Sequence, residues 1–272
     1  MALGAIWGAS FLFVRIVAPV LGPLVTADTR MLIAGAALTV WYRFAGFDPQ
    51  WRRWGGQYAV AGMINTAFPF ILYAFAALTI TAGEMAVLNA TAPMWGAVMS
   101  AAFLGERLRA RRVVGLALGI AGVAFIARPS GQTATLVAIA AGLAAAACYA
   151  FAGIYLRRWA PEVPAKGMAV GTQLVPGLLL LPLVPVWPAP QPTTALVLAS
   201  VLILGLVCGA IAYVLYFRLI TDLGPTGALT VTYLTPLFAM LWGAVFLAEP
   251  VTLTMVGGGA LVIVGTALVL RP

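Results

Sequence analysis

The sequence holds few side chains that could carry out catalysis. It contains 15 Lys and Arg residues, seven Asp and Glu residues and no His. Without His, the chain lacks the commonest general base and the commonest metal ligand. Its two cysteines, Cys148 and Cys208, lie in apolar runs without the CxxC spacing of a metal or redox pair. We therefore expect no serine–histidine hydrolase, no metal site and no cofactor, and the composition argues against an enzyme.

The polar groups within the apolar segments suit binding of a small solute better than catalysis. A tyrosine hydroxyl or an amide at membrane depth needs a hydrogen-bond partner, and rings with a few polar groups typically line ligand cavities. For each residue taken singly, a buried aromatic bonded between helices is an equally good interpretation. As a set, we expect the following residues to bind substrate: Trp7, Tyr73, Asn89, Thr91, Trp95, Tyr149, Tyr213, Tyr216 and Tyr233.

Arg30 and Glu84 are charged residues inside apolar segments, where a charge at a helix centre costs about 2.5 to 3.5 kcal/mol. They can pair with each other, and Asp28 and Glu249 are alternative partners. A functional role is a gate, or an anchor for a substrate carboxylate. A structural role is an ordinary interfacial ion pair or snorkelling. Because no Asp, Glu or Lys is expected near the membrane midplane, we predict no dedicated site for a coupling ion.

Two prolines occupy matching places in apolar segments, Pro93 in "NATAPMW" and Pro236 in "TYLTPLF". A proline inside a helix removes one backbone hydrogen bond and frees the carbonyl four residues earlier, here that of Asn89 or Thr232. Freed carbonyls at membrane depth are tolerated beside protein or a water-filled cavity, so we expect both helices to face a central cleft. The alternative is a simple kink whose carbonyl is satisfied by a neighbouring threonine.

The composition defines the elements that must position these residues. The chain is 63% hydrophobic and 8% charged with a mean hydropathy of +1.06, whereas about a quarter of the residues of a soluble domain are charged. Since a spanning helix takes about 20 apolar residues, we expect an all-α integral membrane protein. Ten spans fit the sequence: 3–19, 24–45, 56–77, 82–104, 112–128, 134–156, 167–187, 194–217, 226–248 and 252–270.

The net charge of +8 reflects topology and does not indicate a nucleic-acid partner, because the basic residues lie in short loops between apolar segments. With ten spans, 12 of the 15 basic residues fall on one side, and Arg15, Arg30 and Arg128 fall on the other. By the positive-inside rule, both chain termini face the cytoplasm.

An internal repeat organises the chain. Residues 93–129 align without a gap on 236–272 at an offset of 143, with fourteen of 37 positions identical, including Glu106 with Glu249. Apolar bias alone does not align charged residues and prolines. The chain therefore reads as two five-helix copies, 1–129 and 130–272, and an odd number of spans per copy makes the second copy inverted. Inverted repeats are the architecture of secondary transporters.

Each copy has a proline followed thirteen positions later by a glutamate, and "LGERL" follows the fourth helix. Together with the ten helices in two inverted copies, these motifs resemble the drug/metabolite transporter superfamily, specifically its EamA-type members. The likeness spans the chain and is greatest to the bacterial YddG-type aromatic amino-acid exporters. It implies amino-acid export from the cytoplasm across the bacterial inner membrane. The cavity would lie among helices one to four and six to nine. The second copy departs from the pattern, with "LAEPV" for "LGERL" and Gln173 for Arg30.

We therefore expect a carrier that exports small amino acids or related zwitterions, aromatic ones included, by alternating access, with lipids as its other partners. An alternative in the same class is a broad carrier for drugs, sugars or neutral metabolites. A lipid scramblase or a membrane enzyme is less favoured, because neither explains the inverted duplication. Nothing in the sequence decides between a monomer and a homodimer.

Overall fold

The computed structural model describes residues 1–127, 133–187, 189–228 and 231–270, and within them every regular element is a helix. Nine helical segments of this part of the chain are long and apolar enough to span a membrane, and the apolar α12 is shorter. The predicted all-α membrane class is confirmed. In order the α-helices are α1 (Ala2–Leu21), α2 (Pro23–Phe44), α3 (Trp51–Gly62), α4 (Phe68–Ala76), α5 (Ala82–Asn89), α6 (Ala92–Leu104), α7 (Ala110–Ala127), α8 (Thr133–Trp159), α9 (Ala165–Leu180), α10 (Ala195–Gly205), α11 (Ala212–Ala228), α12 (Val231–Leu247) and α13 (Leu253–Leu270).

Three bounds differ by five residues or more from the predicted spans, and one of them is the start of the ninth span, because α12 begins at Val231 rather than at 226. The third span starts at Trp51 rather than at 56, because the helix continues through the polar residues that precede its apolar run. The eighth span ends in α11, which runs on to Ala228 through residues expected to form a loop. The predicted boundary between the two copies, at 129/130, lies outside the described residues.

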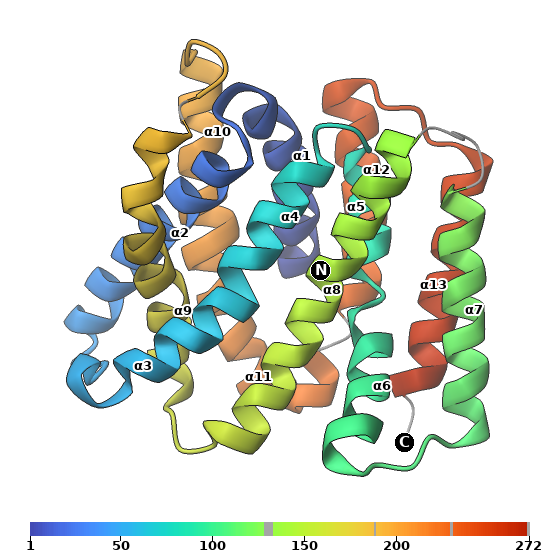
Figure 1. The fold of residues 1–272 in the computed structure, drawn as a ribbon, viewed down its shortest axis with the longest axis horizontal. Helices are drawn as coiled ribbons and strands as arrows, with labels where there is room; N and C mark the ends of the chain where they lie inside the picture. The colour runs from blue at the N-terminus through green and yellow to red at the C-terminus, as the bar shows by residue number, and fades with distance from the viewer. Residues whose placement is uncertain (128–132, 188, 229–230, 271–272) are drawn as a thin grey trace.

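Helices that the offset of 143 relates make equivalent contacts (Figure 1). α1 packs on α12, and the related helix α8 packs on α5 and α6, while α7 and α13 lie side by side. A Cβ atom on Gly115 would lie 2.6 Å from the Gly265 carbonyl oxygen, and one on Gly122 would lie 2.6 Å from that of Gly258. The residue order in α13 is therefore opposite to that in α7. The two related helices run antiparallel, as an inverted duplication requires.

Two π-helical segments interrupt the spans at related positions. η1 (Met63–Ala67) lies between α3 and α4, and η3 (Leu206–Ile211) lies between α10 and α11. The offset of 143 places Met63 on Leu206, so the helix widens into a π-turn at the same position of both predicted copies. Single π-turns inside helices frequently accompany functional sites. A third short segment, the 3₁₀-helix η2 (Leu181–Val186), follows α9.

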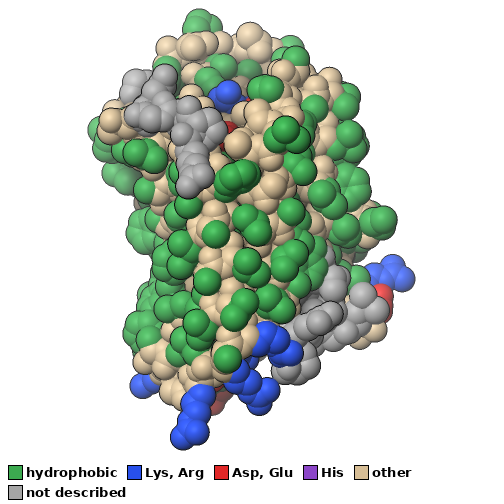
Figure 2. Space-filling model, turned by 90° about the vertical axis from the view of Figure 1, so that its right-hand side faces the viewer, with side chains coloured by type: hydrophobic (Ala, Val, Ile, Leu, Met, Phe, Trp, Pro, Cys, Tyr) green, Lys and Arg blue, Asp and Glu red, His purple; other side chains and the backbone are tan. Residues whose placement is uncertain are grey.

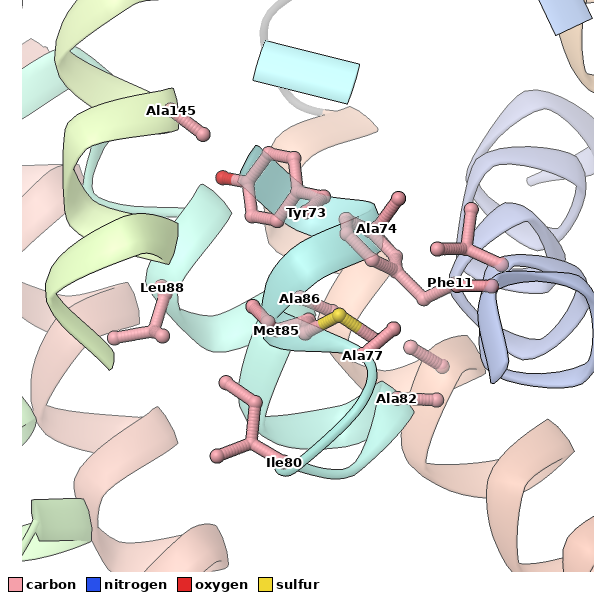
Figure 3. Packing of buried hydrophobic residues seen from close by; sticks show 14 of the residues in the cluster. Phe11, Tyr73, Ala74, Ala77, Ile80, Ala82, Met85, Ala86, Leu88 and Ala145 are labelled. Atoms are coloured by element: carbon pink, nitrogen blue, oxygen red, sulfur yellow. The ribbon is translucent and has the colours of Figure 1, made fainter. Parts of the chain in front are cut away.

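The core around Tyr73 is built from small side chains (Figure 3). Tyr73 stands between α1 and α8, with its hydroxyl directed toward α8, and Phe11 contacts it edge-on with the ring centroids 5.5 Å apart. Ala74, Ala77 and Ala145 in this cluster are buried. Small residues let helices approach closely in a membrane, where packing replaces the hydrophobic effect as the source of association. The tyrosine is thus held in a fixed place.

The outer surface carries large apolar side chains that no other part of the described chain covers. Ile120 is 71% exposed, Val245 63% and Phe246 65%. Figure 2 shows hydrophobic side chains over the middle of one face, with most of the visible Lys and Arg side chains gathered at its lower end. Such an apolar surface matches lipid, since soluble monomers rarely expose patches of this extent.

Candidate binding cavity

A cavity of about 840 Å³ lies among the helices of both predicted copies. Its walls come from α1, α2, α4, α8, α11 and α12, together with η1 and the neighbouring ends of α5, α6 and α9. Most of the aromatic and amide residues singled out from the sequence meet here. The predicted residues in its walls are Trp7, Arg30, Tyr73, Asn89, Tyr149, Tyr213 and Tyr216.

Ring contacts fix the shape of the aromatic walls. Trp7 and Tyr216 lie with ring centroids 5.3 Å apart, and Tyr73 and Tyr149 stack with centroids 6.3 Å apart at an interplanar angle of 24°. The Tyr73 hydroxyl donates a hydrogen bond of 3.2 Å to the Asn89 amide oxygen. Aromatic rings held by one another present a preformed apolar surface with few polar groups, which is typical of small-molecule sites.

The cavity wall follows the internal repeat. Tyr73 and Tyr216 both line it and differ by the offset of 143, as do Asn89 and Thr232. Phe70 pairs with Tyr213 in the same way. Each predicted copy therefore presents the same positions to the cavity from opposite sides, although the residue types differ in some pairs.

Three predicted residues, Thr91, Trp95 and Tyr233, lie outside the wall that the described residues form. The prediction treated 82–104 as one continuous helix, but α5 ends at Asn89 and α6 begins at Ala92, so helical periodicity does not carry across the break. The Thr91 hydroxyl lies in the break between α5 and α6, where it donates a hydrogen bond of 2.6 Å to the Leu88 carbonyl.

Tyr233 lies outside the wall for a different reason. It lies on α12 next to Thr232, whose side chain lines the cavity. Adjacent residues of an α-helix point about 100° apart, so one of them can face a cavity while the other faces a neighbouring helix.

The two prolines have different consequences in the two copies. Pro236 stays inside the continuous helix α12, as predicted. Pro93 stands in the first turn of α6, where a missing N–H costs nothing, so the helix is broken there rather than kinked. The Thr266 hydroxyl, on α13, donates to the Ala90 carbonyl in the break at 2.8 Å. This carbonyl is the one after that of Asn89, which was expected to be freed, so the bond does not decide between the cleft and the simple kink.

Arg30 and Glu84 do not pair with each other. Glu84 is the third residue of α5 and forms a capping box with Thr81, whose backbone N–H donates to its carboxylate at 2.8 Å. Neither alternative partner pairs with Arg30 either. Glu249 binds Arg15 at 3.0 Å, and the Asp28 Oδ1 atom is buried without a hydrogen-bond partner in the described structure.

Arg30 instead faces the cavity. Its guanidinium carbon lies 3.9 Å from the centroid of the Phe70 ring, a cation–π geometry. Arg157, from the end of α8, also reaches the wall and forms an ion pair of 3.3 Å with Glu106. No acidic side chain is part of the wall, although all seven acidic residues of the chain are described. The charge that the cavity presents is therefore positive.

Several wall residues were not predicted. Asn65 comes from η1 and lines the cavity. Phe70 and Thr172 also line the cavity. The sequence feature that could have predicted Asn65 is the adjacent polar pair Asn65 and Thr66 in an otherwise apolar span. The π-turn that contains Asn65 does not change the spacing of apolar residues along the sequence, so it could not be predicted.

The cavity is open at one face of the molecule and packed shut at the other. At the face that carries Glu106, the exposed residues Arg157, Pro161 and Ala165 line the cavity, and Ala160, which is buried, lies beside them. The counterparts of Ala160 and Pro161 by the offset of 143, Val17 and Ala18, have no exposed surface. We call the two ends of the molecule the Glu106 face and the Glu249 face.

Related polar contacts lie at the two faces. At the Glu249 face, Arg15 of α1 binds Glu249 and the Ala77 carbonyl, and the Ala82 N–H donates to the same carboxylate at 2.9 Å. At the Glu106 face, the related Arg158 of α8 binds the Phe103 carbonyl. The Glu249 side chain is 10% exposed and the Glu106 side chain 35%, so the closed face holds the tighter cluster.

A bundle of helices with an apolar outer surface around a ring-lined cavity with a few polar groups is typical of a membrane transporter. The chain matches the model of the EamA-like transporter family twice, over residues 1–128 and 136–271, and it belongs to this family. It is 29% identical over 274 residues to a probable terminal-alkyne amino-acid exporter of Streptantibioticus cattleyicolor, covering 97% of this chain and 90% of that protein.

Further relatives agree in class. An uncharacterized transporter of Bacillus subtilis, YvbV, is 25% identical over 267 residues, which cover 97% of this chain and 87% of the relative. A solved crystal structure shares the fold with a TM-score of 0.68 at 21% identity, covering 98% of this chain and 93% of that one. The expected superfamily and the transporter class are thereby confirmed.

Proposed function

We propose that this transporter exports small amino acids or related zwitterionic metabolites, aromatic ones included, from the cytoplasm. The cavity carries the proposal: rings and amides from both predicted copies surround a space of about 840 Å³, which accommodates a solute of this size. An amino-acid exporter among the relatives supports the same substrate class.

The direction follows from the proposed orientation. Most basic residues of the ten-span topology lie at the Glu106 face, which by the positive-inside rule is cytoplasmic, with both termini on that side of a bacterial inner membrane. In this orientation the cavity is open to the cytoplasm and closed to the outside. The described state is then the one that loads a substrate for export.

Alternating access follows from the inverted copies, 1–129 and 130–272. The cluster of Arg15 and Glu249 closes the outer face in this state, and the related residues at the Glu106 face close the inner one after the copies rock against each other. Because no acidic residue lines the cavity, the transport cycle needs no dedicated ion site at the midplane.

Flux into proteoliposomes tests this function. Purified protein is reconstituted, and uptake of labelled phenylalanine, methionine and threonine is measured against protein-free vesicles. We expect protein-dependent flux of at least one of these amino acids. Folded protein that moves none of them, but moves a dye, a sugar or another neutral metabolite, would instead identify a broad carrier.

A further inference from the structure

We propose that Arg30 is the binding site for a carboxylate group of the transported solute. This inference rests on the proposed function and narrows it, because it limits the substrates to solutes that carry a carboxylate and no net positive charge. Nothing in the family match or in the names of the relatives assigns a ligand to this residue.

Among the described residues, Arg30 has no partner of its own for its charge. All seven acidic residues are described, and none of them forms an ion pair with it. Its Nε–H is buried without a hydrogen-bond acceptor. A guanidinium remains charged under all ordinary conditions and presents five donors, two of them in a fork that matches a carboxylate.

The nearest acid in the sequence does not change this. Asp28 precedes Arg30 by two positions on α2, and side chains two apart on a helix do not face each other. Asp28 is 1% exposed and does not line the cavity, whereas Arg30 does. The positive charge therefore acts on the contents of the cavity without local neutralisation.

The surroundings of Arg30 hold it in place and complement a small amino-acid-like solute. The Phe70 ring lies against its guanidinium at 3.9 Å and fixes the plane of the fork without using a donor. Tyr149 and Tyr213 lie within electrostatic range of Arg30 and line the same space. A carboxylate bound at Arg30 leaves the apolar part of the solute among the rings.

The second predicted copy lacks this arginine. Gln173 takes the place of Arg30 there, and it is fully buried behind the wall rather than part of it. Among the described residues, Arg30 is consequently the one cation of the wall without an acidic partner, because Arg157 is paired with Glu106. A site of this kind orients a solute that carries a single carboxylate, and it repels a purely cationic one.

Ligand-induced thermal stabilisation of the purified protein tests the anchor independently of transport. The probe is 3-phenylpropionate, and its matched control is 3-phenylpropionamide, which has the same ring and chain but no charge. The variant is Arg30→Gln, with Arg30→Lys as the conservative replacement. Arg53→Gln is the control, because Arg53 also stacks on a ring, that of Trp54 at 4.6 Å, but does not line the cavity.

We expect the acid to raise the Tm of the unsubstituted protein and of Arg53→Gln, and the amide to have little effect. Arg30→Gln should weaken binding of the acid by about tenfold or more, the size of a lost charge-assisted hydrogen bond, and Arg30→Lys should weaken it less. Equal stabilisation by acid and amide, stabilisation by neither, or an unchanged affinity in Arg30→Gln would overturn the proposal.

The two proposals fail separately. If the acid binds through Arg30 but no amino acid is transported into proteoliposomes, the anchor stands and the substrate of the proposed function is wrong. If amino acids are transported but the acid and the amide bind alike, the proposed function stands and the anchor is wrong.

Discussion

At the scale of single residues, the cavity is defined by side chains that hold one another. Tyr73 bonds Asn89 and stacks on Tyr149, and Trp7 contacts Tyr216 across the wall. Each ring thus has a fixed position before a solute enters. Preformed sites of this kind lose less free energy to ordering when they bind.

Replacing Tyr216 with Ala removes one ring of the pair with Trp7 and opens the wall. We expect substrate flux to fall by about tenfold or more, the effect typical of a lost aromatic contact in a buried site. Trp95→Ala is the matched control, since Trp95 lies outside the wall. Flux in proteoliposomes at equal protein content is the measurement, and equal losses in the two variants would show that the cavity is not the substrate site.

The sequence predicted much of the wall, because a polar or aromatic residue at membrane depth must face either a partner or a cavity. It did not predict Phe70, whose role depends on Arg30 lying over its ring. It also misassigned Trp95, because the break after Asn89 interrupts the periodicity on which the placement relied.

At the scale of elements, the spans and their pairing could be predicted from apolar length and from the offset of 143. The π-segments η1 and η3 could not, since an extra residue in a turn changes backbone bonding without changing composition. The ion pair of Arg15 with Glu249 was also missed, because residues far apart in the chain meet only after the helices pack.

The Arg15 cluster should hold the Glu249 face closed. Glu249→Gln removes the ion pair and weakens the bond from the Ala82 N–H. We expect it to raise labelling of a cysteine at Val14, which lines the cavity, by a membrane-impermeant thiol reagent added at the Glu249 face.

The background for this labelling lacks both native cysteines, Cys148 and Cys208, through replacement with Ala. We expect the rate to rise severalfold in Glu249→Gln and to remain low in Glu106→Gln, which removes the ion pairs of the related glutamate at the other face. An unchanged rate in Glu249→Gln would mean that the pair does not control closure.

Gly115 and Gly122 of α7 contact Gly265 and Gly258 of α13, and we call these four residues the glycine seam. The seam should tolerate no side chain. A Cβ on Gly122 would lie 2.6 Å from the Gly258 carbonyl oxygen, so Gly122→Ala must push the two backbones apart. We expect a loss of about 1 to 3 kcal/mol in the free energy of unfolding. Denaturant titration in mixed micelles measures it.

Gly96→Ala is the control for the seam, because a Cβ on Gly96 of α6 meets nothing within 4 Å. Its stability should stay equal or rise slightly, since Ala has the higher helix propensity. A loss in Gly96→Ala as large as that in Gly122→Ala would show that contact across the seam is not the cause.

At the scale of the whole molecule, we propose that two related bundles enclose one cavity and open it to one face at a time. The antiparallel packing of α7 on α13 and the wall positions shared at the offset of 143 both fit this arrangement. The described state has its mouth at the Glu106 face and its packed end at Val17 and Ala18. Transport then requires the contacts around Glu249 to separate in each cycle.

Locking the Glu249 face shut tests this requirement most directly. Arg15→Cys and Glu249→Cys are combined in the background without native cysteines, and a short, reducible bifunctional thiol reagent joins the two positions. Our account predicts that flux is lost on cross-linking, although 3-phenylpropionate still binds, and that flux returns on reduction. Undiminished flux through fully cross-linked protein would contradict it.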